Sequence, residues 1–193
     1  EDLYRPYKQK RRTKATIAKE RGLEPLADEL MTFPKIDIVQ IAQKYIDTEK
    51  GVESTDDALI GARDILAERF ADDASIRDQL RKLSRREGKI VTAVKNAEKD
   101  EKQVFEMYYE YEEPVSRIVP HRILAINRGE KEEILRASIT VPVDRAVQMM
   151  ENKWIPKNFT SGAVVHIKEA IADSYKRLIE PSIEREIRAE LTE

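Results

Sequence analysis

Cysteine is absent from the 193 residues, and histidine occurs only at His121 and His166. The missing thiols exclude a disulfide framework and a thiolate zinc site. They also fit a reducing compartment, so we expect a cytoplasmic protein. Neither histidine has a second histidine or a carboxylate at the spacing of a zinc motif such as HExxH. The sequence therefore predicts no metal site; His121 is expected to pack or to bond to backbone groups, and His166 to be solvated.

Long apolar runs and glycine-rich loops are also missing. No stretch approaches the roughly eighteen apolar residues of a transmembrane helix, so no membrane contact is expected. The six glycines form neither GxGxxG nor GxxxxGK[ST], and no nucleotide or other cofactor is expected. The carboxylates lie in charged or helix-capping contexts, which do not single out a pair for acid–base chemistry. We therefore expect no enzyme, and an enzyme with an unrecognised site is the third class of hypothesis after the two given below.

Charged residues are abundant but nearly balanced in sign. They make up 37% of the chain and apolar residues 40%, a composition typical of a helix-rich globular protein. The net charge is −2, from 35 basic and 37 acidic residues, so the chain as a whole does not attract nucleic acid strongly. The basic residues are concentrated at one end, because residues 1–21 hold eight basic residues and three acidic ones.

Apolar residues recur at helical spacing over most of the chain. Thr13 or Thr16 is expected to cap the first helix and Gly22 to end it. Gly129 is expected to end a later helix, and Pro181 to kink or split the last one. The expected helices cover approximately residues 13–21, 25–31, 38–46, 55–88, 120–128, 143–154 and 161–191.

Two segments alternate between apolar and polar residues instead. Residues 89–95 and 134–141 are predicted as strands, whereas residues 104–111 fit either a strand with alternating aromatics or a helical turn. The predicted fold class is mainly α, a multi-helix, bundle-like scaffold with a small β element of two or three short strands.

The charged loop at residues 96–102 is the expected seam between two subdomains. Residues 1–95 would form a helical subdomain with the basic N-terminal segment, and residues 96–193 a helical subdomain with a short strand and a long C-terminal helix. At the end of the chain, an apolar stripe has nothing after it in the sequence to pack against. We expect the rest of a parent protein or a second copy to cover this stripe, which comprises Ile183, Ile187 and Leu191.

Five basic residues near the N-terminus form the candidate nucleic-acid-binding site: Lys8, Lys10, Arg11, Arg12 and Lys14. Cations pair with phosphates, and the nearby rings of Tyr4 and Tyr7 offer faces on which bases stack. The same cations would serve equally in ion pairs with acidic helices of this chain, or in contact with another domain. The sequence leaves these alternatives open.

Two segments of the chain carry a resemblance to a known family. Residues 3–27 read LYRPYKQKRRTKATIAKERGLEPLA, and residues 116–130 read SRIVPHRILAINRGE. Both resemble segments of the Tex family of bacterial transcription accessory proteins, whose members show LYxPYKxKRRTxATIAxxxGLEPLA and IPxHRxLAxxRGE.

The resemblance implies a fragment of a larger protein, lying between the family's N-terminal helix-turn-helix and its RNase H-like domain. Tex-like proteins are nucleic-acid-binding factors related in architecture to a eukaryotic elongation factor, and their helix-hairpin-helix and S1 modules would lie beyond Glu193. The resulting hypothesis is a non-catalytic scaffold that positions flanking domains, with RNA or DNA bound through the parent protein and the transcription machinery as a further partner. The alternative is a nucleic-acid-binding module that acts through Lys8 to Lys14.

Overall fold

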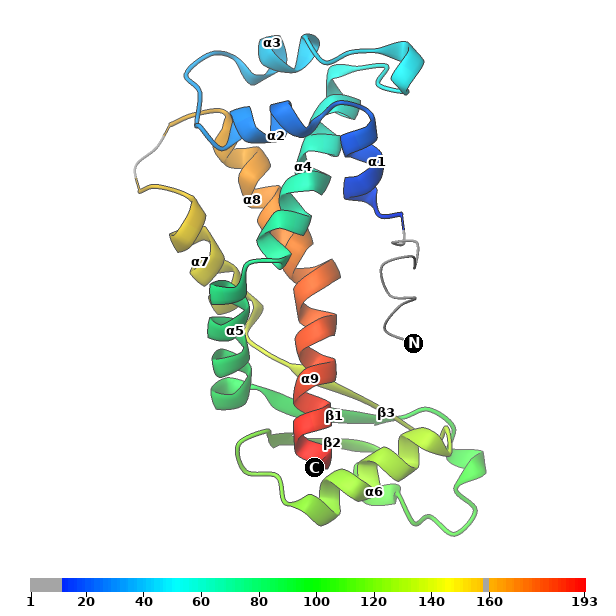
Figure 1. The fold of residues 1–193 in the computed structure, drawn as a ribbon. Helices are drawn as coiled ribbons and strands as arrows, with labels where there is room; N and C mark the ends of the chain where they lie inside the picture. The colour runs from blue at the N-terminus through cyan, green and yellow to red at the C-terminus, as the bar shows by residue number, and fades with distance from the viewer. Residues whose placement is uncertain (1–11, 158–159) are drawn as a thin grey trace, which may run out of the picture. The chain divides into compact units, whose positions relative to one another are not determined.

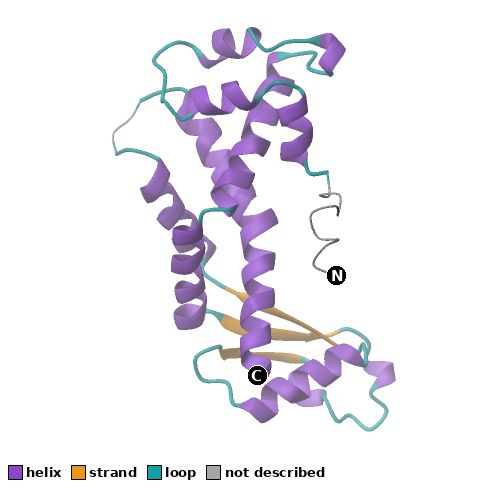
Figure 2. Ribbon diagram, in the orientation of Figure 1, coloured by secondary structure: helices purple, strands orange, loops and turns teal. Residues whose placement is uncertain are grey.

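The computed structural model describes residues 12–157 and 160–193. The chain forms two compact units, one comprising residues 1–70 and 154–174 and the other residues 71–153 and 175–193. Each unit therefore combines segments that are far apart in the sequence. Helices dominate, and a small antiparallel sheet lies in the second unit (Figure 2), which confirms the predicted fold class.

The first unit is built from helices joined by turns (Figure 1). Thr13 caps its first helix as predicted, because its Oγ1 accepts the Thr16 N–H at 3.1 Å, and Gly22 follows that helix with a φ of +78°. The third helix ends at Gln43 rather than near Ile46, which is 40% exposed. The helices are α1 (Lys14–Glu20), α2 (Glu24–Leu30), α3 (Ile38–Gln43), α4 (Thr55–Ala71, with Ala71 assigned to the second unit) and α8 (Ala163–Asp173).

Close packing in the first unit depends on a glycine in α4. A Cβ atom at Gly61 would lie 2.3 Å from Cδ1 of Leu23, which is 1% exposed. The missing side chain therefore lets α4 approach the turn between α1 and α2. The core of this unit consists of apolar side chains that include Leu26, Leu30, Ile41, Ile65 and Leu66.

The sheet of the second unit has the strand order β2-β1-β3, with both pairs antiparallel. The strands are β1 (Lys89–Val94), β2 (Glu110–Pro114) and β3 (Leu135–Thr140). β2 answers the ambiguity at residues 104–111, because a 3₁₀ turn at Glu106–Tyr108 precedes a strand that begins at Glu110. The boundary expected at residues 95 and 96 falls inside this unit, where it would separate β1 from both of its hydrogen-bonded partners.

The second unit also contains four helices: α5 (Ala74–Glu87), α6 (Pro120–Lys131), α7 (Val143–Trp154, with Trp154 assigned to the first unit) and α9 (Glu180–Thr192). The expected continuous helix over 55–88 is wrong, because α4 ends at Ala71 and a new helix, α5, begins at Ala74. Asp73 caps α5 by accepting a hydrogen bond from the Ile76 N–H. The end of α6 predicted at Gly129 is also wrong, since the helix continues to Lys131. Gly129 instead allows α6 to pack closely against Leu135, because a Cβ at this position would lie 2.4 Å from Cδ1 of Leu135.

The C-terminal helical run changes its hydrogen-bonding pattern shortly before Pro181. Residues Ser174–Ile179 form a π-helical segment, and α9 begins directly after it. A π-helical turn alters the pairing of backbone groups, which accommodates a residue that has no N–H to donate. The predicted interruption is therefore a change of helix type rather than a break.

The apolar stripe of α9 is covered within the second unit. Ile183 and Ile187 are buried, and α9 lies against α5, α6 and β3 (Figure 1). Leu191 packs against an apolar cluster formed by Ile90, Phe105, Tyr108, Ile123, Ile126, Ile134 and Leu135. The expectation that a parent domain or a second copy covers this stripe is wrong, because segments that end 40 or more residues before α9 begins fold onto it.

Candidate nucleic-acid interface

The structure describes part of the predicted basic site. Lys8, Lys10 and Arg11 lie outside the described residues. Arg12 is exposed and donates to Glu20 at 2.6 Å, one of the ion pairs within the chain that the sequence left open. Lys14 is exposed on α1 and forms no ion pair with any residue in the described part of the chain. The role of the five cations in binding nucleic acid stays a prediction.

A hollow of about 330 Å³ runs beside Lys14. Both of its walls follow the spacing i, i+3, i+4, i+7 of one helix face. One wall has Lys14, Ile17 and Ala18 from α1 and Arg21 directly after it, and the other has Asp57, Ile60, Gly61 and Asp64 from α4. Cations occupy one wall and carboxylates the other. A phosphate chain would be repelled by the α4 wall, so this hollow is not a continuous phosphate-binding groove.

The described part of the first family-like segment, residues 12–27, helps to build the first unit. The Thr13 hydroxyl donates to Oε2 of Glu68 at 2.9 Å, which ties the start of α1 to α4. Ala15 and Ala18 are buried on the inner side of α1. The described part of this segment therefore has a structural role.

The second family-like segment forms α6, whose inner face is anchored by a bidentate ion pair. Arg122 donates from Nε and Nη2 to the two carboxylate oxygens of Glu113, at 2.9 and 2.8 Å. The hydroxyl of Tyr111 also donates to Glu113, at 2.6 Å. Burial opposes ionisation of Glu113, but the bonds from Tyr111 and Arg122 outweigh it and lower its pKa. The pair fixes α6 to β2.

The same helix is bonded to α9 through Arg188. Its Nη2 donates to Oδ1 of Asn127 at 2.6 Å and to Glu130, while Nδ2 of Asn127 donates to Thr192 at 3.0 Å. Arg188 is mostly buried, with 17% of its side chain exposed. The inward-facing polar residues of the second segment therefore hold three elements together: β2, α6 and α9.

The outward face of α6 has a different character. His121, Leu124, Arg128 and Lys131 are exposed on it. Arg128 lies 3.6 Å from Glu132 and 5.9 Å above the centre of the Phe105 ring. The prediction that His121 packs or bonds to backbone groups is wrong, because it lies in the first turn of α6, where its side chain points into solvent.

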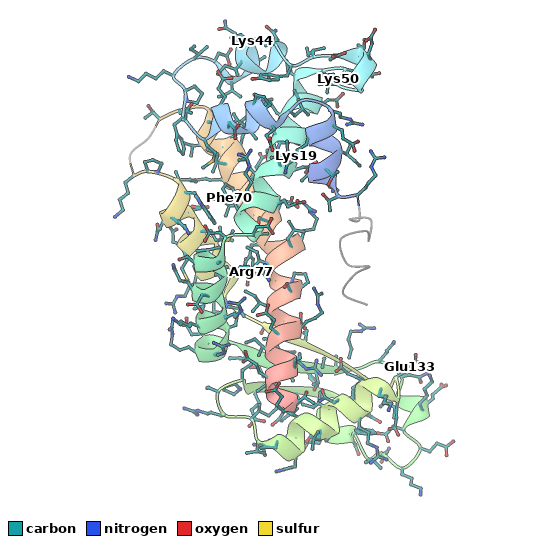
Figure 3. The ribbon with its side chains drawn as sticks, viewed as in Figure 1. Lys19, Lys44, Lys50, Phe70, Arg77 and Glu133 are labelled. Carbon is teal, nitrogen blue, oxygen red and sulfur yellow. The ribbon has the colours of Figure 1, made fainter. Side chains whose placement is uncertain are left out.

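A ladder of polar contacts joins α5 to α9. Three arginines of α5 contact three residues of α9, in the pairs Arg77–Ser182, Arg81–Glu186 and Arg85–Glu190. Every pair is separated by 105 residues, so the two helices run parallel with matching four-residue steps. Figure 3 labels Arg77 on α5, beside α9. This ladder was not predicted from the sequence, although both sets of residues recur at i, i+4 and i+8.

His166 is half-buried in the first unit, and the prediction that it is solvated is wrong. Its Nδ1 lies 2.9 Å from Nη1 of Arg63, and Arg63 also pairs with Glu169 at 3.3 Å. Burial lowers the pKa of His166, and the Arg63 charge lowers it further. A neutral imidazole therefore accepts the hydrogen bond from the guanidinium.

The described residues contain neither a metal-binding group of side chains nor a membrane-spanning helix. No group of three or more histidine, aspartate or glutamate side chains among residues 12–157 and 160–193 could hold a metal ion. No helix in the same ranges is long and apolar enough to cross a membrane.

Comparison with protein families identifies the family of this chain. The family described as Tex central region-like matches residues 34–193, which is most of the chain. The chain belongs to the Tex family. The resemblance to the Tex family is thereby confirmed by a match that spans both compact units and contains the second segment, residues 116–130, whereas the first segment, residues 3–27, precedes the match.

Three relatives illustrate how much of a longer protein the matched segment represents. YdcI of Bacillus subtilis is 52% identical over 195 residues, covering 100% of this chain and 27% of the relative. Protein tex of Bordetella pertussis is 38% identical over 144 residues, covering 75% of this chain and 18% of the relative. S1 RNA-binding domain-containing protein 1 of Homo sapiens is 30% identical over 205 residues, covering 100% of this chain and 20% of the relative. This Tex-family chain spans about a quarter or less of the length of these relatives.

Replacing Arg81 with alanine should lower the free energy of unfolding by about 1 kcal/mol, because a partly exposed ion pair on the α5–α9 ladder is lost. Urea denaturation followed by circular dichroism measures the change without adding salt. Arg86→Ala is the matched control: Arg86 is exposed on the same helix and has no ion pair among the described residues. Glu186→Ala should cost less after Arg81→Ala than in the wild-type chain, because only the 3.8 Å contact of Glu186 with Arg77 is then left to lose. Fully additive effects would contradict the pairing.

Stability should fall as the pH drops from neutrality through the ordinary histidine pKa of about 6.5. The unfolded chain then binds a proton on His166 that the folded chain does not bind until the lower, folded pKa is reached, so protons favour unfolding in this window. His166→Asn should reduce the change in the urea midpoint between pH 7 and pH 5.5. Both pH values lie about one unit or less from that pKa. His121→Asn, which removes the exposed imidazole of α6, is the control. Equal effects of the two substitutions would refute the assignment to His166.

Proposed function

We propose that this chain is a non-catalytic helical scaffold of a Tex-like, nucleic-acid-associated transcription accessory protein, in which it positions the flanking domains. The observation that carries the proposal is the use of the polar residues on the inner face of α6. Arg122 bonds to Glu113, and Asn127 and Glu130 bond to Arg188, so these groups hold elements together within the unit. Side chains engaged in this way give a rigid arrangement and are not free to act on a substrate.

The names of the relatives support the association with nucleic acid. A relative in Neisseria gonorrhoeae is named transcriptional accessory protein Tex, and the human relative is named for an S1 RNA-binding domain. We propose that the parent protein of this chain likewise binds RNA or DNA, acts in the cytoplasm and contacts the transcription machinery. In this proposal the nucleic-acid affinity comes largely from flanking domains that the scaffold holds at fixed positions relative to one another.

A chimera tests the scaffold role. This chain would replace the matching segment of Bacillus subtilis YdcI, and RNA affinity would be measured by fluorescence anisotropy. Arg188→Met should lower the melting temperature and weaken RNA binding about fivefold or more, because flanking binding modules lose their preset geometry and with it their combined affinity. Arg188 is mostly buried, so direct contact with RNA would not explain the loss.

Arg185→Met is the matched control for the chimera. It removes the same charge from the same helix at an exposed position, and it should leave RNA affinity within about twofold. The scaffold role is contradicted if Arg188→Met lowers the melting temperature and RNA affinity stays at the wild-type level. It is equally contradicted if both substitutions weaken binding alike, since charge rather than architecture would then be responsible.

A second candidate function is a nucleic-acid-binding module acting through Lys8 to Lys14. It is favoured by the exposure of Lys14 and by the absence of an ion pair for it within the described residues. Changing Lys10, Arg11 and Arg12 to glutamate in the isolated chain should then abolish salt-dependent binding to single-stranded RNA or duplex DNA. Unchanged anisotropy titrations would exclude this candidate.

A further inference from the structure

The sheet of the second unit has two edge strands, because β1 lies between β2 and β3 (Figure 1). An edge strand directs every second backbone N–H and C=O group away from the sheet, where another strand can pair with them. The edge formed by β3 is closed in part by α9. The N–H of Ile139 donates to Oε1 of Glu184 at 3.0 Å, and α6 and α9 both pack against β3.

The described residues provide no such cover for the edge formed by β2. The N–H of Val94 donates to the carbonyl oxygen of Tyr109 at 2.9 Å, so the odd-numbered residues of this segment direct their backbone groups toward β1. The two N–H and two C=O groups of Glu110 and Glu112 therefore point away from β1. None of these four groups has a hydrogen-bond partner among residues 12–157 and 160–193. β2 thus offers an unpaired edge.

A hollow of about 410 Å³ lies beside this edge. Its lining consists of residues from β1 and β2: Val91, Thr92, Glu110, Tyr111 and Glu112. The lining therefore contains two carboxylates and no cation, unlike the hollow between α1 and α4, whose walls carry opposite charges. The register pairs Glu112 with Val91, so the carboxylates lie on the face of the sheet opposite to the buried Thr92.

Cations elsewhere on the sheet engage these carboxylates weakly. Lys89 contacts Glu112 at 3.4 Å, but the two side chains are 51% and 60% exposed, and an ion pair in such an exposed position adds little. Arg136 shares this face of the sheet but lies on β3, two strand spacings or about 10 Å from β2. Neither Arg136 nor Glu110 forms an ion pair within the part of the chain that the structure describes. The unpaired edge is therefore acidic.

Charge decides which kind of strand fits this edge. A strand that pairs with β2 would satisfy the four free backbone groups, and its side chains would lie about 5 Å from those of Glu110 and Glu112. A second copy of β2 would place glutamates next to glutamates, and like charges at this spacing destabilise the pair. Lysine or arginine at every second position of the added strand would instead form pairs of opposite charge. The edge therefore fits a basic strand from a different protein.

We propose that the free edge of β2 is a docking site for an extended, basic peptide segment of another protein, which adds a fourth strand to the sheet. Backbone hydrogen bonds to Glu110 and Glu112 hold the peptide, and cations at alternate positions of the peptide select it. The proposal concerns a protein partner. It goes beyond the scaffold role and does not depend on the proposed association with nucleic acid.

Fluorescence anisotropy with the 193-residue chain and short labelled peptides tests the charge requirement. A peptide in which lysine alternates with threonine should bind with a dissociation constant below about 1 mM. Glu110→Gln combined with Glu112→Gln should weaken binding about fivefold, because two cross-strand pairs of opposite charge are lost. Asp72→Asn combined with Asp144→Asn removes two charges at exposed positions outside β2, and it should weaken binding no more than about twofold.

Methylated peptides test whether the backbone of the peptide pairs with β2. In an antiparallel pair, a lysine opposite Glu110 or Glu112 exchanges both backbone hydrogen bonds with it and shares its face of the sheet. N-methylation of the lysines should therefore abolish binding. N-methylation of the threonines, whose N–H groups would face solvent, should leave the affinity within about twofold, and both peptides keep the same charge.

Hydrogen exchange followed by NMR locates the bound peptide. At a peptide concentration that occupies about nine tenths of the chain, exchange of the Glu110 and Glu112 amides should slow about tenfold, because only the unoccupied tenth exchanges. The amides of Tyr111 and Glu113 are directed toward β1, and their exchange should change less.

The proposal is overturned if the alternating peptide does not bind below about 1 mM, or if a peptide with the same lysines and threonines in two blocks binds equally well. It is also overturned if the two double variants bind alike, if the two methylated peptides bind alike, or if exchange at Glu110 and Glu112 is unchanged. Circular dichroism checks that each variant is folded. These results leave the scaffold proposal untouched, since Arg188→Met in the chimera decides it.

Discussion

The burial of α9 is the constraint on which the second unit depends. Ile183 and Ile187 supply the apolar side of the contact, and the ladder from α5 supplies matching charges along its edge. Burying two isoleucines contributes several kcal/mol, at about 1.5–3 kcal/mol each, which is more than a set of partly exposed ion pairs provides. The apolar contact therefore supplies most of the stability, while the four-residue charge repeat selects the parallel register. Arg188 then extends α9 to α6, so that one helix orders both a neighbouring helix and the sheet behind it.

α6 carries different kinds of residue on its two sides. Its inner face is filled by Ile123 and Ile126 and by the bonds of Arg122, and none of these groups is available to a ligand. Its outer face keeps Arg128 and Lys131 in solvent. The inner side therefore carries the contacts that hold α6 in the second unit.

Much of the local structure follows from the sequence, and the errors have a common cause. The cap at Thr13, the strand at residues 89–94 and the helix at residues 143–154 were predictable from short-range spacing and turn chemistry. Gly129 was misjudged because a glycine near a helix end favours termination, whereas here contact with Leu135 requires it inside the helix. The exposed stripe expected at the C-terminus was misjudged for the same reason, since the segments that cover it lie far away in the sequence.

The sequence by itself determined the family, the mainly helical class and the concentration of cations near the N-terminus, because each depends on residue identity or on neighbours within a few positions. Only the tertiary structure decided the partners of the cations farther along the chain. Arg85 and Glu190 are 105 residues apart and meet because two helices pack in parallel. Long-range pairing of this kind depends on which apolar faces are buried together, and no local pattern in the sequence specifies that choice.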